Sequence, residues 1–181
     1  MFLNGTSSSG KTSLAKALQL LMGGEGQAYL YVSLDEFFDM LPEVFHADIQ
    51  AHILVGSGFN RAVAAMASAG NNLVVDTLFA VPEWRWEAAR ALRRIPRAYL
   101  VGVRCGLEEV ERREGARGDR PAGQARAQFP VVHAGIEYDL EVDAGELNAH
   151  ECAARIKAHV DSGARPRAFA WLRRDERSRM R

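Results

Sequence analysis

The chain has 181 residues, of which 48% are hydrophobic and 25% are charged, and its 23 basic side chains balance its 23 acidic ones. This size and composition predict one globular domain, and the neutral balance gives no support for a nucleic-acid-binding protein. Cys105 and Cys152 form no C-x-x-C pair, which argues against a metal knuckle or a disulfide framework. No apolar run is long enough to span a bilayer, so we expect a cytoplasmic protein with no membrane partner.

A phosphate-binding motif follows the first predicted strand. Phe2-Leu3-Asn4 predicts a buried strand, and Gly5-Thr6-Ser7-Ser8-Ser9-Gly10-Lys11-Thr12 matches G-x-x-x-x-G-K-[ST]. Apolar side chains then recur at helical spacing from Ser13 to Met22. Glycines at both ends let successive N–H groups turn towards a phosphate, and the helix presents its positive dipole end to the same anion. We expect ATP to contact Gly5, Thr6, Ser7, Ser8, Ser9, Gly10, Lys11, Thr12 and Ser13.

Two side chains of this motif have roles that follow from their chemistry. Lys11 would reach the β- and γ-phosphates as a point charge, which makes it a candidate catalytic residue. The hydroxyl of Thr12 would bind Mg²⁺. The alternative is a small-residue turn that only caps a helix. The match at all fixed positions, with a strand before the loop and a helix after it, favours nucleotide binding.

The chain then predicts a second strand and a short helix. Glycines at 23–26 end the first helix, Tyr29–Ser33 reads as a strand, and a short helix is expected over Glu36–Leu41. Residues 43–58 are open to two interpretations, a helix around Ile49–Val55 or a loop that covers the site.

The middle of the chain alternates helix and strand. A helix is expected over Phe59–Ala69, a central apolar strand over Leu73–Asp76, a helix over Pro82–Arg94 and a strand over Ala98–Val103. Parallel strands separated by helices are typical of a three-layer α/β domain, in which ligands bind beyond the carboxyl ends of the strands.

Asp35 and Asp76 each fall at such a strand end. Phosphoryl transfer to a hydroxyl needs a carboxylate that orients the alcohol and accepts its proton, and Asp35 is our candidate for this base. Asp76 ends the central strand as a Walker B acid does, and is our second candidate metal ligand beside Thr12. The alternatives are helix caps or, for Asp76, a satisfied buried acid.

The last third of the chain predicts a lid and a fifth strand. Helices are expected over Gly106–Glu114, 124–132 and Ala149–Val160, and an edge strand over Tyr138–Val142. The segment 115–123 is rich in glycine and charge. The whole pattern predicts a three-layer P-loop kinase fold with a five-stranded parallel sheet in residues 1–162, with a lid near 115–128.

Three arginines, Arg113, Arg117 and Arg120, cluster at this lid. Arginines that fold over phosphates stabilise the charge on the transferring group, so Arg117 and Arg120 are candidate catalytic residues. A solvated charged loop is the alternative reading. His133 lies close by and is expected to be structural rather than a ligand to substrate.

Residues 163–181 form a basic tail with seven arginines against Asp175 and Glu176, a net charge of +5. We favour a solvated or docked tail over nucleic-acid binding, because the rest of the chain has no basic stripe. Phe169, Trp171 and Leu172 would attach the tail to the domain or to a second subunit, which leaves a homo-oligomer open.

Apolar and aromatic side chains follow the strand ends where an acceptor would bind. They predict either an apolar pocket for an aromatic substrate or ordinary core. These residues are Phe37, Phe38, Met40, Leu41, Phe45, Trp84 and Trp86.

The chain resembles the chloramphenicol phosphotransferase-like family of P-loop kinases. The resemblance rests on the run Leu3 to Ser13, on Leu73-Val74-Val75-Asp76 and Val101-Gly102-Val103-Arg104-Cys105, and on Arg113-Glu114-Gly115-Ala116-Arg117-Gly118-Asp119-Arg120. It continues in Gln128, Val132-His133 and Glu137-Tyr138-Asp139-Leu140-Glu141-Val142-Asp143.

This resemblance implies an ATP-dependent kinase that phosphorylates a hydroxyl of chloramphenicol or a related amphenicol and so inactivates the antibiotic. It also implies Asp35 as the base, Lys11 and Thr12 as phosphate and metal contacts, and Arg117 or Arg120 as the lid arginine. Kinases of another small metabolite or of a nucleotide sugar, a non-catalytic nucleotide-binding regulator and a kinase of nucleic-acid ends are the alternatives.

Overall fold

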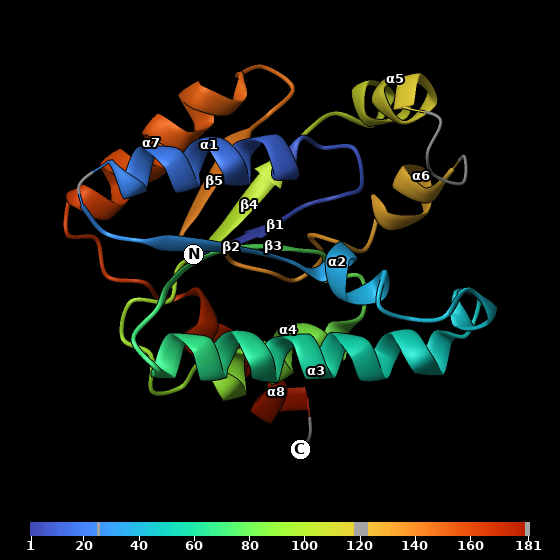
Figure 1. The fold of residues 1–181 in the computed structure, drawn as a ribbon, viewed down its shortest axis with the longest axis horizontal. Helices are drawn as coiled ribbons and strands as arrows, with labels where there is room; N and C mark the ends of the chain where they lie inside the picture. Colours follow the sequence, from blue (N-terminus) through green and yellow to red (C-terminus); the bar gives the residue numbers. More distant parts are fainter. Residues whose placement is uncertain (25, 118–122, 180–181) are drawn as a thin grey trace.

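The computed structural model describes residues 1–24, 26–117 and 123–179, and it places a parallel sheet between two layers of helices (Figure 1). The strands are β1 (Phe2–Asn4), β2 (Tyr29–Ser33), β3 (Asn72–Thr77), β4 (Leu100–Arg104) and β5 (Leu140–Asp143). They lie in the order β2-β3-β1-β4-β5, and each pairing is parallel. The expected five-stranded parallel α/β sheet is confirmed, and the last strand does lie at an edge.

Helices cover both faces of this sheet. They are α1 (Lys11–Gly23), α2 (Leu34–Phe38), the short 3-10 helix η1 (Glu43–Phe45), α3 (Ile49–Ser68), α4 (Pro82–Ala91), α5 (Leu107–Arg117), α6 (Gln124–Gln128), α7 (Ala149–Asp161) and α8 (Ala168–Arg179). In Figure 1, α1 and α7 lie on one face, and α3, α4 and α8 lie on the other. The segments α2, η1, α5 and α6 lie at one end of the sheet.

Strand side chains divide between two cores because neighbouring residues of a strand point to opposite faces. Leu3 and Val74 pack with α1 and α7, whereas Phe2 and Val75 pack with α3, α4 and α8. Both cores consist of buried aliphatic and aromatic side chains. Such two-sided burial explains why the central strands are apolar runs rather than alternating ones.

One helix resolves the stretch that was open to two interpretations. Residues 43–58 hold η1 and the first half of α3, which runs unbroken through the helix expected over Phe59–Ala69. Asp48 caps α3, since its side chain accepts hydrogen bonds from the N–H groups of Gln50 (2.8 Å) and Ala51 (3.2 Å).

Several element ends differ from the prediction. The second helix begins at Leu34 and ends at Phe38, so Asp35 lies in its first turn rather than before it. The predicted helices that were to end at Arg94 and 132 end at Ala91 and Gln128. Pro130 explains the second of these, because proline has no N–H to donate and restricts the residue before it.

The fifth strand also starts later than predicted, at Leu140 instead of Tyr138. The ring of Tyr138 instead lies over Gly102, where a Cβ would come within 2.8 Å of it. The carboxylate of Asp139 accepts hydrogen bonds from the N–H groups of Leu100, Arg167 and Ala168. Tyr138 and Asp139 therefore contact other segments of the chain, and the pairing of β5 with β4 begins only after them.

The basic tail forms α8 and packs on α4. Phe169 and Leu172 are buried in the core below the sheet, and the ring of Phe169 meets that of Phe2 edge-on at 5.1 Å. The Arg173 guanidinium donates a hydrogen bond to the Ala89 carbonyl (2.8 Å). Of the two positions that the sequence left open for the tail, solvated or docked, the structure shows the docked one. Within the described ranges, no helix combines the length and apolarity needed to cross a bilayer.

Candidate active site

The phosphate-binding loop connects β1 to α1 and has the backbone shape that its glycines predict. Gly10 has φ 94° and Ser8 has φ 59°, both in the left-handed region. A Cβ on Gly5 would lie 2.5 Å from the Val103 carbonyl oxygen, so a side chain cannot be accommodated there. Because α1 starts at Lys11, the N–H groups of its first turn have no partner within the helix and remain suited to an anion.

The two motif side chains with predicted roles both lie beside Asp76. The Lys11 ammonium donates a hydrogen bond to the Thr6 carbonyl oxygen (2.7 Å) and lies 4.0 Å from Asp76 Oδ1. The Thr12 hydroxyl donates to Asp76 Oδ2 (2.8 Å). The side chain of Tyr31 lies next to this pair, with its hydroxyl 3.5 Å from Asp76 Oδ2, and burial raises the pKa of Tyr31.

Thr12 and Asp76 have the ligand chemistry that Mg²⁺ prefers. Both offer oxygen atoms, and Mg²⁺ in phosphate-transfer sites takes one or two carboxylates and completes its shell with water and phosphate oxygens. Among the described residues, no group of three or more His, Cys, Asp or Glu side chains forms a dedicated metal cage. The Thr12 hydroxyl and the Asp76 carboxylate fit a Mg²⁺ ion that takes its other ligands from water and from nucleotide phosphates.

A small polar cavity of about 60 Å³ opens at this loop. Its walls are Ser7, Ser8, Gly10, Lys11, Thr12, Ser13, Asp35 and Asp76. The hydroxyl of Ser8 is buried and has no hydrogen-bond partner among the described residues. A phosphate oxygen would satisfy it, since buried polar groups are normally paired. The structure thus brings Asp35, from α2, to the same cavity as the motif.

A larger cavity of about 280 Å³ shares four of these residues, namely Ser7, Lys11, Asp35 and Asp76. Its remaining walls include the apolar side chains of Leu34, Ile49, Leu78 and Val81, the rings of Phe38, His52 and Trp84, and the carboxamides of Gln124 and Gln128. It combines charged groups at one end with aromatic and aliphatic walls. This arrangement suits a molecule that presents a polar atom to Asp35 and Lys11 and an apolar body to α3 and α4.

Two of the seven apolar candidates line that cavity, Phe38 and Trp84. Phe37 instead packs on Phe59, with ring centroids 5.1 Å apart, and Met40 and Phe45 are exposed. The Trp84 indole lies so close to α3 that a Cβ on Gly56 would come within 2.3 Å of it. Gly56 is therefore needed for this wall to form.

Several lining residues were not assigned to the site from the sequence, among them Ile49, His52, Gln124 and Gln128. The first two lie one turn apart at the start of α3, in the stretch whose secondary structure was undecided. The last two lie one turn apart on α6. The i, i+3 and i, i+4 spacing was the available signal, but the sequence does not say towards which element these faces turn.

On the far side of the loop lies a third cavity, of about 450 Å³. Ser8, Gly10 and Ser13 line it together with Arg112, Arg113 and Asn148, so it continues from the phosphate loop towards α5 and α7. Arg113 is held there by hydrogen bonds to the carbonyl oxygens of Ala144 (2.9 Å) and Ser9 (3.4 Å) and by an ion pair with Glu109 (2.6 Å).

The other two lid arginines cannot be placed with it. Arg120 lies outside the described residues, as does the side chain of Arg117, and with them the part of the predicted lid from 118 to 122. Of the three arginines, the structure describes the side chain of Arg113, which contacts the outer side of the phosphate loop.

A buried polar network supports the loop from below. The Asn4 carboxamide donates to the Val132 carbonyl oxygen (2.8 Å) and to the Tyr138 hydroxyl (2.7 Å), and it accepts from the Phe79 N–H (2.7 Å). His133 Nδ1 lies 2.7 Å from the Tyr138 hydroxyl. Burial lowers the pKa of His133 to about 4 and raises that of Tyr138 to about 12. Both side chains are therefore neutral at pH 7, which fits the structural role expected for His133.

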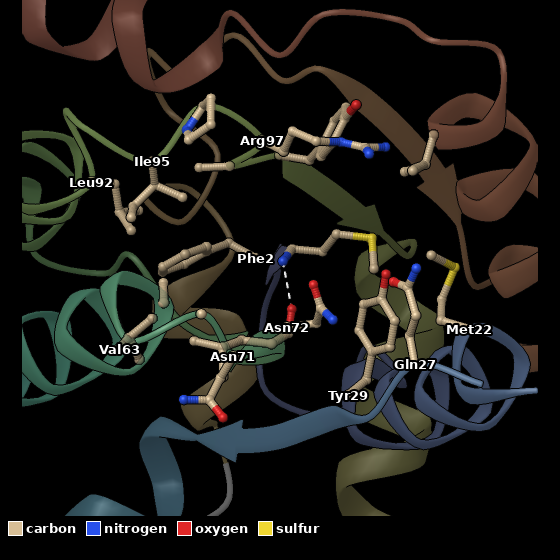
Figure 2. Close-up of a pocket in the computed structure, with 18 residues that line it drawn as sticks. Phe2, Met22, Gln27, Tyr29, Val63, Asn71, Asn72, Leu92, Ile95 and Arg97 are labelled. Atoms are coloured by element: carbon tan, nitrogen blue, oxygen red, sulfur yellow. Dashed lines mark hydrogen bonds between the residues drawn. The ribbon is translucent and has the colours of Figure 1, made fainter. Parts of the chain in front are cut away.

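A separate cavity of about 270 Å³ lies on the opposite side of the sheet, where the strands begin (Figure 2). We call this side the amino edge, and the side where the strands end the carboxyl edge. Figure 2 shows Val63, Leu92 and Ile95 on one side of it and Gln27 and Tyr29 on the other. None of the predicted site residues that the structure describes lines it.

Comparison with known proteins agrees with the geometry. The model of the family described as "Chloramphenicol phosphotransferase-like protein" matches residues 1–161. A Mycobacterium tuberculosis protein named "Putative O-phosphotransferase" is 31% identical over 200 residues, which cover 96% of this chain and 87% of that protein; it matches in two strains.

Solved P-loop kinases share the fold. The Mycobacterium tuberculosis APS kinase superposes with a TM-score of 0.69 at 19% identity, over 88% of this chain and 95% of that one. A gluconokinase from Sinorhizobium meliloti 1021 superposes with a TM-score of 0.66 at 16% identity, over 90% and 91%. The fold is therefore that of the P-loop kinases, and the chain is a phosphotransferase that belongs to the chloramphenicol phosphotransferase-like family.

Proposed function

We propose that the protein is an ATP- and Mg²⁺-dependent kinase that phosphorylates a hydroxyl of a small molecule. One observation carries the proposal: Lys11 and Asp35 line both the small polar cavity at the phosphate loop and the larger cavity with aromatic walls. A phosphoryl group bound in the first would lie beside an alcohol bound in the second. Donor and acceptor would thus meet at these two side chains.

The roles follow from the chemistry of each group. Asp35 would accept a hydrogen bond from the acceptor hydroxyl and take its proton as the new P–O bond forms. Lys11 and the loop N–H groups would stabilise charge on the transferring phosphoryl group. Thr12 and Asp76 would hold Mg²⁺, which when bound neutralises phosphate charge. Arg117 and Arg120 stay candidates for the arginine that closes over the phosphates.

The proposed acceptor is chloramphenicol or a related amphenicol, and the activity is then antibiotic inactivation. The family description and the aromatic walls formed by Phe38, His52 and Trp84 support this choice. Another small hydroxylated metabolite or a nucleotide sugar is the alternative acceptor. The same catalytic groups would serve either, because they contact the hydroxyl and the phosphoryl group rather than the body of the acceptor.

The test is the rate of ADP formation from ATP with and without chloramphenicol, in wild type and Asp35→Ala. We expect the drug to raise the rate and Asp35→Ala to lower the stimulated rate by about 10²- to 10⁴-fold, the usual contribution of a general base. Asp39→Ala is the matched control, because Asp39 is an exposed acid directly after α2.

The outcomes separate the parts of the proposal. Equal rates with and without the drug exclude amphenicols, and the same assay with gluconate then tests a sugar-acid acceptor. Full activity of Asp35→Ala on any acceptor contradicts the base assignment. Phosphorus NMR of the product identifies the esterified hydroxyl.

A further inference from the structure

Gln128 connects α6 directly to the phosphate loop. Its Oε1 accepts a hydrogen bond from the Ser7 N–H at 2.7 Å, and only 9% of the residue is exposed. Gln128 also lines the larger cavity, where Lys11 and Asp35 lie. A contact between residues separated by 121 positions in sequence is thus made inside the proposed site.

The backbone on both sides of α6, the helix that carries Gln128, is held by buried hydrogen bonds. Glu114, itself 7% exposed, accepts hydrogen bonds from the N–H groups of Gly123 (2.8 Å) and Ala125 (2.7 Å), which fixes the start of the helix. Beyond the helix, the Val132 carbonyl accepts from Asn4, the last residue of β1. The hydrogen bonds to the Glu114 carboxylate before Gln128, and the one from the Asn4 carboxamide after it, therefore fix the backbone that carries Gln128.

The peptide group that Gln128 contacts is the one that holds Lys11. The Thr6 carbonyl and the Ser7 N–H belong to the same planar trans peptide and point in opposite directions. Gln128 accepts from the N–H end (2.7 Å), and the Lys11 ammonium donates to the carbonyl end (2.7 Å). Fixing the N–H end fixes the carbonyl end, and a hydrogen bond at one end strengthens the other as an acceptor.

We propose that Gln128 is a positioning residue for Lys11 that acts through the Thr6–Ser7 peptide. The inference rests on the proposed function, because it assigns Lys11 to the phosphates of ATP. Without the carboxamide, the Ser7 N–H would lose its buried partner and the peptide would rotate towards another acceptor. The ammonium of Lys11 would then lose the carbonyl against which it now rests.

The first measurement is amide hydrogen exchange at Ser7 in wild type, Gln128→Met and Arg126→Met. Methionine keeps the length of glutamine and removes the acceptor oxygen. We expect exchange at Ser7 to accelerate about tenfold in Gln128→Met, the loss of one buried hydrogen bond, and to stay unchanged in Arg126→Met. Arg126 is the control because it lies on the exposed side of α6, paired with Glu111. Unchanged protection in Gln128→Met would overturn the proposal.

The second measurement is the affinity for the nonhydrolysable ATP analogue AMP-PNP, determined by calorimetry below the melting temperature of every variant. We expect Gln128→Met to weaken binding about tenfold in the wild-type background and to have less than about a twofold effect when Lys11 is already methionine. A lesion that only loosened the fold would weaken binding equally in both backgrounds, and that additivity would contradict action through Lys11. A wild type that fails to bind AMP-PNP would refute the proposed function, while the Ser7 exchange would still test the contact with Gln128.

Discussion

The larger cavity that holds Lys11 and Asp35 and the cavity at the amino-terminal edge of the sheet are nearly equal in size. The one at the carboxyl edge measures about 280 Å³ and the one at the amino edge about 270 Å³. Lys11, Asp35 and Asp76 line the first, whereas Arg97 is the charged side chain among the described walls of the second. Volume therefore does not identify the site.

The difference between the two edges comes from the direction of the strands. At the carboxyl edge the chain leaves the sheet through the phosphate loop, and the first N–H groups of α1, which have no partner within the helix, favour an anion. At the amino edge the chain enters the sheet, and amide, aromatic and aliphatic side chains from strands, helices and loops line the cavity (Figure 2). Substitutions at the carboxyl edge should therefore lower phosphotransfer, and substitutions at the amino edge should not.

Beyond Asp35→Ala, the largest effect is expected for Lys11→Met at the carboxyl edge. Removing the ammonium leaves transition-state charge on the phosphoryl group unbalanced, so phosphotransfer should fall by about 10²- to 10³-fold. Steady-state kinetics measure this loss. Lys16→Met is the control, because Lys16 is an exposed lysine of the same helix, and it should leave the rate unchanged. Equal losses in the two variants would contradict the assignment.

A smaller effect is expected for Gly56→Ala, which lies against the Trp84 wall of the larger cavity, where the acceptor is proposed to bind. The new methyl group would collide with the Trp84 indole, which lies 2.3 Å from the Cβ position, and should destabilise the protein by about 1–3 kcal/mol. It should also raise KM for the acceptor more than KM for ATP. Gly58→Ala is the matched control, since its Cβ meets nothing within 4 Å and helix propensity favours alanine by roughly 1 kcal/mol. Denaturant unfolding and KM values measure both effects, and equal values for Gly56→Ala and Gly58→Ala would contradict the contact with Trp84.

The network below the loop predicts a pH dependence. His133 titrates at a pKa of about 4 when folded, against 6.5 ordinarily, so the unfolded chain binds a proton between these values and the folded chain does not. This contribution is therefore fully present above pH 6.5 and is lost as pH falls towards 4. Allowing for partial exposure, wild type should lose about 2 kcal/mol more than His133→Gln over this range. Urea unfolding at pH 7 and pH 4 measures it; parallel losses in the two proteins would be contrary evidence.

The smallest effect is expected at the amino edge. Arg97→Ala removes an exposed side chain from that cavity, so stability should change by less than about 0.5 kcal/mol and phosphotransfer should be unchanged. A clear loss of activity in this variant would show that the amino edge takes part in the reaction.

The parts of the molecule that local sequence determines were predictable. The strand before the loop, the loop itself and the apolar central strand follow from short-range patterns, and Asp35 and Asp76 follow from strand direction. The start of α3 was not predictable, because Gly56 and Gly58 weaken the helical pattern and only the packing of Trp84 explains the first of them.

Polar contacts between residues far apart in the sequence could not be predicted from local sequence patterns. Asn4 pairs with Val132 and Tyr138, and Ser7 pairs with Gln128, across more than 120 residues in each case. For the tail, the sequence left a solvated and a docked position open, and the structure buries Phe169 and Leu172 of α8, at i, i+3 spacing, in the core. Such contacts depend on which faces meet, and sequence spacing does not state this.

Amide NMR during a titration with Mg²⁺ and AMP-PNP locates the nucleotide site, because it reports on both edges of the sheet in one experiment. We expect the largest shifts at residues 5–13, at Asp35 and around Asp76, with the amino edge at residues 27–29, 70–73 and 95–99 unaffected. Shifts concentrated at the amino edge, with the phosphate loop unchanged, would contradict this expectation.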